Sequence, residues 1–335
     1  MSKKPIKALA LMSTGLDSLI AAKLVKDQGV DVHGITFFYR FDNLAKQQAS
    51  GEIQKLVAPL GIPITVIDIS DDFLPTLLNP PHGYGSNFNP CIDCHLFMFR
   101  RAFAMLEEMD AQFLITGEVM GQRPMSQNSQ TLAHMSKIME FSDLLLRPMS
   151  AKLLPETKPE REGWVDREKL LDISGRSRKR QFELVEALGI EHYSKPGGGC
   201  ILTIPQFGKR AKALKSRKAI EKITVADFEL MRLGRHLWPS NHLLVVVGRH
   251  EEDNTALEAF VPGRTRLEAL DISGPITVAD GINNTADLEL AAQITVRYCG
   301  TKVAGPVRVG WSDDRGSGEL TVTAADREEL KGWLI

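Results

Sequence analysis

The sequence predicts an α/β protein, a doubly wound parallel sheet followed by a smaller C-terminal α+β domain. An apolar run of strand length at residues 7–12 leads through a turn of small residues into an amphipathic segment with helical spacing. Strand-like and helix-like segments then alternate with a repeat of about thirty residues, which is typical of βα units in a parallel sheet. The pattern changes after about residue 240, which indicates a second unit.

The elements follow in order along the first half of the chain. We expect strands at residues 32–38, 64–69, 113–116 and 144–146, with helices at 44–60 and 94–109. Ligands of open α/β sheets bind beyond the carboxyl ends of the strands. We therefore expect the segments that follow strands to share one crevice, namely residues 13–18, 79–94, 118–127 and 147–152.

Composition places the chain among ordinary globular proteins. Of its 335 residues, 43% are hydrophobic and 25% are charged, and the net charge of -1 indicates that any nucleic-acid surface must be local. About two domains are expected from this length. No signal-peptide core and no apolar run of membrane-spanning length occur, so a cytoplasmic protein without a membrane partner is expected.

The first turn carries the main chemical signal. Ser13-Thr14-Gly15-Leu16-Asp17-Ser18 joins the first strand to a helix start. Small residues let backbone N–H groups converge, and the helix N-terminus adds partial positive charge, so the turn suits a phosphate. It is neither a Walker loop nor Gly-x-Gly-x-x-Gly. A simple helix-capping loop is the structural alternative.

The four cysteines are too few for a disulfide scaffold in a chain of this length. Cys91 and Cys94 precede or begin a helix, Cys200 follows a glycine run at 197–199, and Cys299 lies in the second unit. Three interpretations of the first three cysteines are open. They hold a four-iron four-sulfur cluster with one open iron, they form a persulfide relay, or they are buried thiols or a structural zinc site completed by His95.

These motifs together resemble the tRNA-uridine thiolase group of the PP-loop, or N-type, ATP pyrophosphatases, whose fold is the adenine nucleotide alpha hydrolase type. The resemblance rests on the turn at 13–18, Asn-Pro-Cys-Ile-Asp-Cys-His, Thr-Gly-Glu-Val-Met-Gly-Gln-Arg-Pro, Leu-Leu-Arg-Pro-Met-Ser-Ala-Lys and Gly-Gly-Gly-Cys-Ile-Leu-Thr, and covers about residues 5–215. Thr14 replaces the usual first glycine of the turn. Because a β-branched residue disfavours positive φ, a slightly different turn is expected there.

The resemblance implies the site residues. ATP and Mg²⁺ would contact Ser13, Thr14, Gly15, Leu16, Asp17, Ser18, Phe37, Gly117, Glu118 and Arg123. Asp17, Cys91, Cys94 and Cys200 would be catalytic, and the three cysteines would be the metal ligands of the cluster. Arg123, Arg147 and Lys152 are further candidate cations for the pyrophosphate, and Glu118 is a candidate for magnesium or ribose. Asp93, between two thiols, is a candidate acid or base.

The strongest local charge follows the sheet. Residues 176–218 contain 11 Lys or Arg against 3 Glu, and such a stripe favours an RNA backbone over a solvated helix face. The expected RNA-binding residues are Arg176, Arg178, Lys179, Arg180, Lys209 and Arg210. The expected domains are an ATP-binding domain at 1–175, a basic helical region with Cys200 at 176–240, and an accessory α+β domain at 241–335 that weakly resembles the NFACT RNA-binding domain.

The expected activity is ATP-dependent tRNA sulfur transfer. A uridine carbonyl would be adenylated and its oxygen replaced by sulfur from inorganic sulfide or a persulfide carrier, with ATP, Mg²⁺ and a four-iron four-sulfur cluster as cofactors. A homodimer is possible. Two alternatives are a PP-loop tRNA-binding module without thiolation, for example one that serves a desulfurase, and a PP-loop ligase or amidotransferase that acts on a small molecule and contains a structural zinc.

Overall fold

The computed structural model describes residues 5–42, 45, 47–48, 51–194, 200–300 and 305–335. The chain divides into two compact units, Met1–Ile201 and Leu202–Ile335. Residues 176–240 are shared between them, because helix α8 (Lys179–Ala187) packs on the first unit and α9 (Pro205–Arg217) lies in the second. In the described ranges, no helix is long and apolar enough to cross a membrane.

The first unit is built on a parallel sheet of five strands in the order β3-β2-β1-β4-β5. Its strands are β1 (Lys7–Leu11), β2 (Asp31–Phe38), β3 (Ile64–Asp68), β4 (Phe113–Thr116) and β5 (Leu145–Leu146). In the register, Leu9 of β1 lies between His33 of β2 and Leu114 of β4. The strand order reverses between β1 and β4, the position where doubly wound sheets bind ligands.

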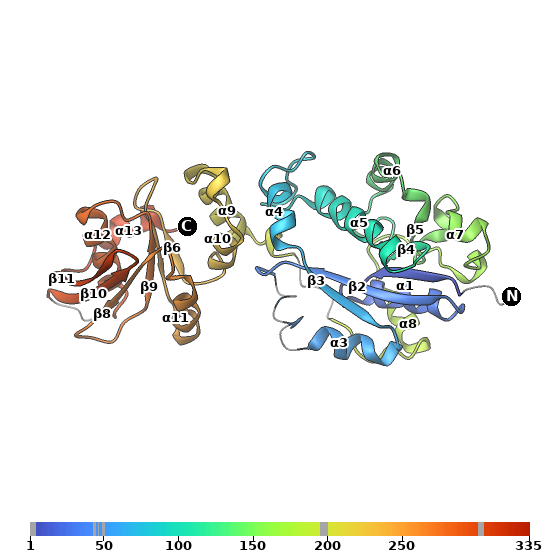
Figure 1. Cartoon of the computed structure of the whole chain (residues 1–335), viewed down its shortest axis with the longest axis horizontal. Coiled ribbons are helices and arrows are strands. Elements are labelled where there is room, and N and C mark those ends of the chain that lie inside the picture. The colour runs from blue at the N-terminus through green and yellow to red at the C-terminus, as the bar shows by residue number, and fades with distance from the viewer. Residues whose placement is uncertain (1–4, 43–44, 46, 49–50, 195–199, 301–304) are drawn as a thin grey trace. The chain divides into compact units, whose positions relative to one another are not determined.

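Helices cover both faces of this sheet (Figure 1). The remaining helices of the unit are α1 (Leu16–Lys26), α3 (Glu52–Val57), α4 (Ser70–Leu78), α5 (Cys91–Glu108), α6 (Ser129–Ile138) and α7 (Lys158–Arg161). On one face, buried Leu19 and Ile20 of α1 share a core with Val57 of α3 and Val185 of α8. α4 and α5 pack together on the opposite face. The α/β doubly wound prediction is confirmed.

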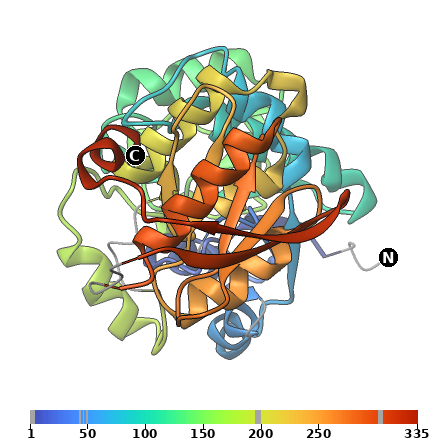
Figure 2. The same cartoon turned by 90° about the vertical axis from the view of Figure 1, so that its left-hand side faces the viewer.

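The second unit contains a six-stranded antiparallel sheet in the order β11-β10-β8-β9-β7-β6. Its strands are β6 (Arg235–Leu237), β7 (Leu244–Val247), β8 (Thr265–Ala269), β9 (Thr277–Asp280), β10 (Val307–Asp313) and β11 (Gly316–Val322). Its other helices are α10 (Val225–Leu230), α11 (Glu251–Leu257), α12 (Thr285–Arg297) and α13 (Arg327–Trp333). Helix α12 crosses one face of the sheet (Figure 2) and buries Ala291 and Ile294 against it. The expected C-terminal α+β domain is confirmed.

Candidate functional site

The turn between β1 and α1 is closed by its own small side chains. The Ser13 N–H donates to Ser18 Oγ over 3.2 Å, and Ser18 Oγ–H donates to the Gly15 carbonyl over 2.8 Å. Helix α1 begins at Leu16, which is buried, so the turn leads directly into the helix N-terminus. This is the geometry of a phosphate cradle.

Thr14 takes the conformation expected of the glycine that it replaces. Its φ of +59° lies in the left-handed region, which a β-branched residue rarely adopts. Its hydroxyl donates to the Ser13 carbonyl over 2.6 Å and lies 2.7 Å from Ser194 Oγ, while the Ser194 N–H donates to the Thr14 carbonyl over 3.0 Å. These hydrogen bonds offset the strain of the left-handed backbone at Thr14. Thr14 therefore keeps a positive φ, and its β-branched side chain changes the turn little.

Asp17 fits a hard cation. Its Oδ2 accepts a hydrogen bond from Gln122 Nε2 over 2.6 Å, and Gln122 Oε1 in turn accepts from Gln181. Its Oδ1 is buried without a hydrogen-bond partner in the described part of the chain. A buried carboxylate oxygen with a free lone pair is the kind of ligand that Mg²⁺ prefers, so the residue suits a magnesium nucleotide.

The end of β4 approaches this turn closely. A Cβ placed on Gly117 would lie 2.5 Å from the Ser18 backbone nitrogen, a distance that no side chain tolerates. The glycine is therefore needed for the close packing of β4 on the start of α1. Phe37 is a buried residue near the end of β2, and Arg123 is exposed in the segment after β4.

A chain of charged groups begins at Glu118, the residue after Gly117. His95 Nδ1 lies 3.0 Å from Glu118 Oε1, and Arg147 Nε donates to Glu118 Oε2 over 2.8 Å. Burial would raise the pKa of Glu118, but Arg147 and His95 hold it below its ordinary value. Burial would lower the pKa of His95, yet its bonds to Cys91 and Glu118 raise that pKa to about 9. These contacts therefore favour the cationic form of the imidazole.

Cys91 is the first residue of α5, and His95 lies one turn later on the same helix face. Burial would raise the pKa of the Cys91 thiol, but the adjacent His95 ring and Arg123 bring it below its ordinary value. A helix N-terminus acts in the same direction. The arrangement therefore favours a thiolate at Cys91. The sequence analysis did not pair these two residues, although their i, i+4 spacing could have indicated the contact.

The pKa of the Cys94 thiol is shifted in the opposite direction. Its Sγ lies 3.0 Å from the hydroxyl of buried Tyr39, and burial together with Cys200 and Cys91 raises the pKa of its thiol. The charge of Cys200 also raises the pKa of both the Cys94 thiol and Tyr39. Cys200 therefore lies in the same region as Cys91 and Cys94. Within the described ranges, however, no three His, Cys, Asp or Glu side chains are grouped to hold a metal ion. The glycine run at 197–199 lies outside those ranges.

Asp93 stabilises the loop that precedes α5. Its Oδ1 lies 2.7 Å from His82 Nδ1, and its Oδ2 accepts from the His82 backbone N–H over 3.0 Å. The carboxylate is 4% exposed. Both carboxylate oxygens therefore contact His82 and hold the loop in place.

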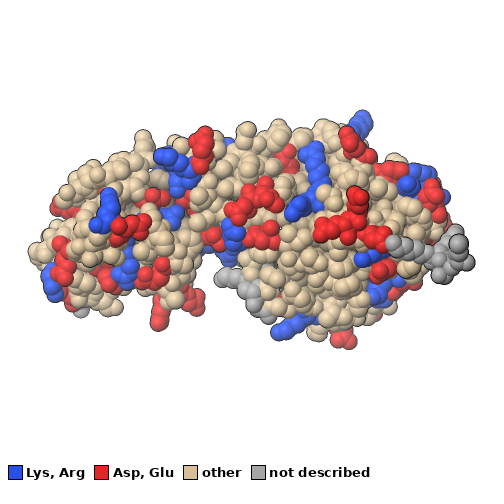
Figure 3. Space-filling view, viewed as in Figure 1, with Lys and Arg blue, Asp and Glu red and all other residues tan. Residues whose placement is uncertain are grey.

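The predicted RNA contacts differ in their surroundings. Arg176, Lys179 and Lys209 are exposed and Arg178 is half-buried, while exposed Arg180 pairs with Asp172 over 2.7 Å. Arg210 is buried, and its guanidinium donates to the carbonyls of Met231 and Gly234. On the face shown in Figure 3, Lys and Arg are interspersed with Asp and Glu. Of the remaining cations, Lys152 donates to Glu168.

Two family models match the chain. Residues 5–152 match the model described as thiamine biosynthesis protein (ThiI), and residues 234–334 match the NFACT protein RNA binding domain. Neither model covers half of the chain. The two matches fall on the parallel-sheet unit and on the antiparallel-sheet unit, respectively.

Similar proteins include tRNA-specific 2-thiouridylases. The Rhizobium etli (strain CIAT 652) enzyme is 32% identical over 136 residues, which are 36% of this chain and 33% of the relative. The Methylorubrum populi enzyme is 24% identical over 338 residues, or 91% of this chain and 82% of the relative. The Rhizobium etli match is typical of the first relatives, because the chain spans only about a third of their length.

Solved structures with a similar chain course include a 4-thiouridine synthetase–RNA complex with bound ATP. It has 19% sequence identity and a TM-score of 0.36, and the match covers 55% of this chain and 51% of that one. The C-terminal part of a fibronectin/fibrinogen-binding protein from Streptococcus suis has 13% identity and a TM-score of 0.28, with 79% of this chain and 100% of that chain covered.

Proposed function

We propose that this chain, whose N-terminal unit is a PP-loop domain of the tRNA thiolase group, is an ATP-dependent sulfurtransferase that adenylates a uridine carbonyl of tRNA and replaces its oxygen with sulfur. The observation that carries the proposal is the end of β4. Gly117 packs against the phosphate-binding turn, and its neighbour Glu118 holds the His95 ring beside Cys91. The proposed ATP site and the proposed reactive thiol therefore depend on two consecutive residues, Gly117 and Glu118.

The nucleotide half of the site supports the adenylation step. The uridine oxygen attacks the α-phosphorus of ATP, and pyrophosphate leaves with the electron pair of the broken P–O bond. The turn at residues 13–18 would hold the phosphates, and Asp17 Oδ1 would bind Mg²⁺, which neutralises charge on the leaving pyrophosphate. The reaction leaves AMP attached to the uridine oxygen, and AMP is a good leaving group.

The cysteine half supports the sulfur step. We propose that Cys91 accepts sulfur from a persulfide carrier, because its thiolate is stabilised by His95. The terminal sulfur attacks the adenylated carbon, and AMP leaves with the C–O electron pair. A second thiol of the trio then attacks the Cys91 sulfur, so that a disulfide forms, sulfur stays on the uridine carbon, and an external thiol later reduces the disulfide.

The cluster expected from the sequence stays a prediction. Cys91 interacts with His95 and Cys94 with Tyr39, and the described residues contain no preformed metal-binding group, so no step is derived through a cluster. Iron and acid-labile sulfide analysis after anaerobic purification, with the Cys91→Ala/Cys94→Ala/Cys200→Ala variant beside it, decides between the two chemistries. About four irons per chain, lost in the variant, would replace the relay by a cluster.

The RNA partner is supported by both units. Exposed Arg176 and Lys179 flank the start of α8, and exposed Lys209 and Lys212 lie on α9. The match of residues 234–334 to an RNA-binding domain model supports a second contact. We propose that the basic residues bind the tRNA backbone and that the C-terminal unit adds affinity.

The direct test uses tRNA, ATP, Mg²⁺ and a persulfide-loaded desulfurase, with release of pyrophosphate and formation of thiouridine measured together. The proposal expects both products from the wild type and neither from Asp17→Asn. Binding of tRNA without pyrophosphate release would favour a non-catalytic tRNA-binding module. Pyrophosphate release that depends on a small molecule instead of RNA would favour a ligase or amidotransferase.

A further inference from the structure

A pocket of about 350 Å³ lies beside β5, between α6 and the start of α7. Most of its wall is apolar, with Leu132, Leu145 and Leu154 among the contributors. Ser129, Ser136, Ser142 and Thr157 also line it. Pockets of this size and composition are typical of small-molecule sites.

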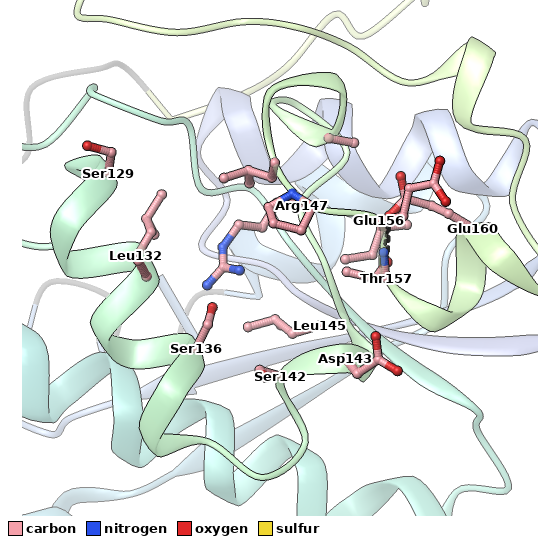
Figure 4. Close-up of a pocket in the computed structure, with 15 residues that line it drawn as sticks. Ser129, Leu132, Ser136, Ser142, Asp143, Leu145, Arg147, Glu156, Thr157 and Glu160 are labelled. Atoms are coloured by element: carbon pink, nitrogen blue, oxygen red, sulfur yellow. Dashed lines mark hydrogen bonds between the residues drawn. The ribbon is translucent and has the colours of Figure 1, made fainter.

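The Arg147 guanidinium points into this pocket, toward Leu132 and Ser136 (Figure 4). Arg147 is 7% exposed, and its Nε is fixed by Glu118. Its Nη2 is buried and has no hydrogen-bond partner in the described part of the chain. Buried donors in native proteins almost always have acceptors, so this nitrogen indicates that the pocket receives an acceptor atom.

The kind of acceptor follows from the guanidinium. Its planar N–H groups match the oxygens of a carboxylate or a phosphate, and the mostly apolar wall favours a carboxylate that carries an apolar body. Three acidic residues line the wall. Asp143 pairs with Arg161, Glu160 pairs with Arg167, and Glu156 Oε1 lies 3.9 Å from Arg167 Nε. Each of the three therefore pairs with another arginine, and Nη2 of Arg147 stays without a partner among the described residues.

We propose that this pocket binds a small organic carboxylate with a compact apolar body, whose oxygens accept hydrogen bonds from Arg147. The apolar body would lie against the leucine side chains of the wall. The site is separate from the phosphate-binding turn and from the cysteines, none of which line it. Arg147 also contacts Glu118, so the ligand would sit next to the group that orients His95.

The test is calorimetric titration of the full chain with benzoate, butyrate and phenylacetate, and with the three matching neutral amides. We expect saturable binding of at least one carboxylate and about tenfold weaker binding of its amide, since the amide lacks the charge. Ala133→Phe, from an exposed position that lines the pocket, should fill it and abolish binding. Ala104→Phe, at an exposed helical position outside the pocket, should bind as the wild type does.

Failure of all three carboxylates to bind the folded wild type would overturn the proposal and indicate that a water pairs with Arg147. Equal binding of an amide, or unchanged binding by Ala133→Phe, would overturn it too. If Ala133→Phe lowers the melting temperature, Ser136→Met fills the same space from the next turn of α6. The titration contains no ATP, RNA or sulfur donor, so its outcome does not depend on the proposed thiolation.

Discussion

Gly117 and Glu118 are consecutive in the chain and serve the two halves of the site. A Cβ on Gly117 would lie 2.5 Å from the Ser18 nitrogen in the phosphate-binding turn. Glu118 Oε1 lies 3.0 Å from His95 Nδ1, on the helix that begins with Cys91. A shift of β4 would therefore disturb nucleotide binding and the thiol together.

Gly117→Ala should abolish ATP binding. The added methyl group must displace the backbone at Ser18, which also costs about 1–3 kcal/mol of stability. Gly332→Ala is the matched control, because nothing lies within 4 Å of a Cβ at that helical position. Titration with ATP and thermal unfolding check both effects. Wild-type ATP affinity in Gly117→Ala would contradict the close packing of β4 on the turn.

Asp17→Asn should remove the magnesium dependence of ATP binding while leaving the fold intact. The amide oxygen can still accept from Gln122, but the lost charge weakens the cation site. Titration with ATP at several Mg²⁺ concentrations measures the effect, and circular dichroism checks the fold. An unchanged Mg²⁺ response would mean that another oxygen holds the cation.

Cys91 should be the first cysteine to react with iodoacetamide at neutral pH. His95 stabilises its thiolate, whereas burial raises the pKa of Cys94. His95→Gln removes the cation and should slow alkylation of Cys91 at pH 7, because the pKa of the thiol rises and the thiolate population falls. Peptide mapping by mass spectrometry gives the rate at each cysteine. Faster reaction at Cys94 than at Cys91 in the wild type would be inconsistent with the thiolate assignment.

Exposed and buried basic residues of α9 should behave differently. Lys209→Glu/Lys212→Glu should weaken tRNA binding and flatten its salt dependence without changing the melting temperature. Arg210→Met should instead lower the melting temperature, because it leaves the Met231 and Gly234 carbonyls without their donor. Lys137→Glu, at an exposed position of α6, is the charge control. Equal RNA affinity for the double variant and the wild type would remove α9 from the interface.

The stability of the second unit should fall in acid through Asp253. This carboxylate accepts from the Gly234 N–H and pairs with Arg249, and its pKa lies below the ordinary value even though burial would raise it. A depressed carboxyl pKa adds stability above the unfolded-state pKa and loses it as pH falls through the folded-state pKa. The melting-temperature difference between the wild type and Asp253→Asn should therefore shrink below about pH 4. A constant difference down to pH 2 would show that Asp253 does not contribute to acid unfolding.

The sequence predicted the strands well, because apolar runs bounded by turn residues identify buried parallel strands. The ranges 64–69 and 113–116 correspond to β3 and β4 within one residue. The helix expected at 94–109 begins three residues earlier, at Cys91. Pro90 is the N-cap residue, a position whose N–H is not needed for a hydrogen bond within the helix. The helix can therefore begin directly after it and include both cysteines.

The charge chain could not be predicted from the sequence. His95, Glu118 and Arg147 are separated by 23 and 29 residues, and their pairing depends on where α5 packs against β4 and β5. Glu118 was expected to bind magnesium or ribose, and Arg147 the pyrophosphate. In the structure these two side chains form an ion pair, and Asp17 Oδ1 is a buried carboxylate oxygen without a hydrogen-bond partner among the described residues.

The most direct test of the account follows the α-phosphate of labelled ATP in single turnover with tRNA and a persulfide donor, for wild type and Cys91→Ser. We expect the wild type to release labelled AMP and to form thiouridine. Cys91→Ser should leave labelled AMP attached to the RNA and form no thiouridine, because adenylation needs the PP-loop and sulfur transfer needs the thiol. Normal thiouridine formation by Cys91→Ser, or no transfer of label to RNA by either protein, would contradict the account.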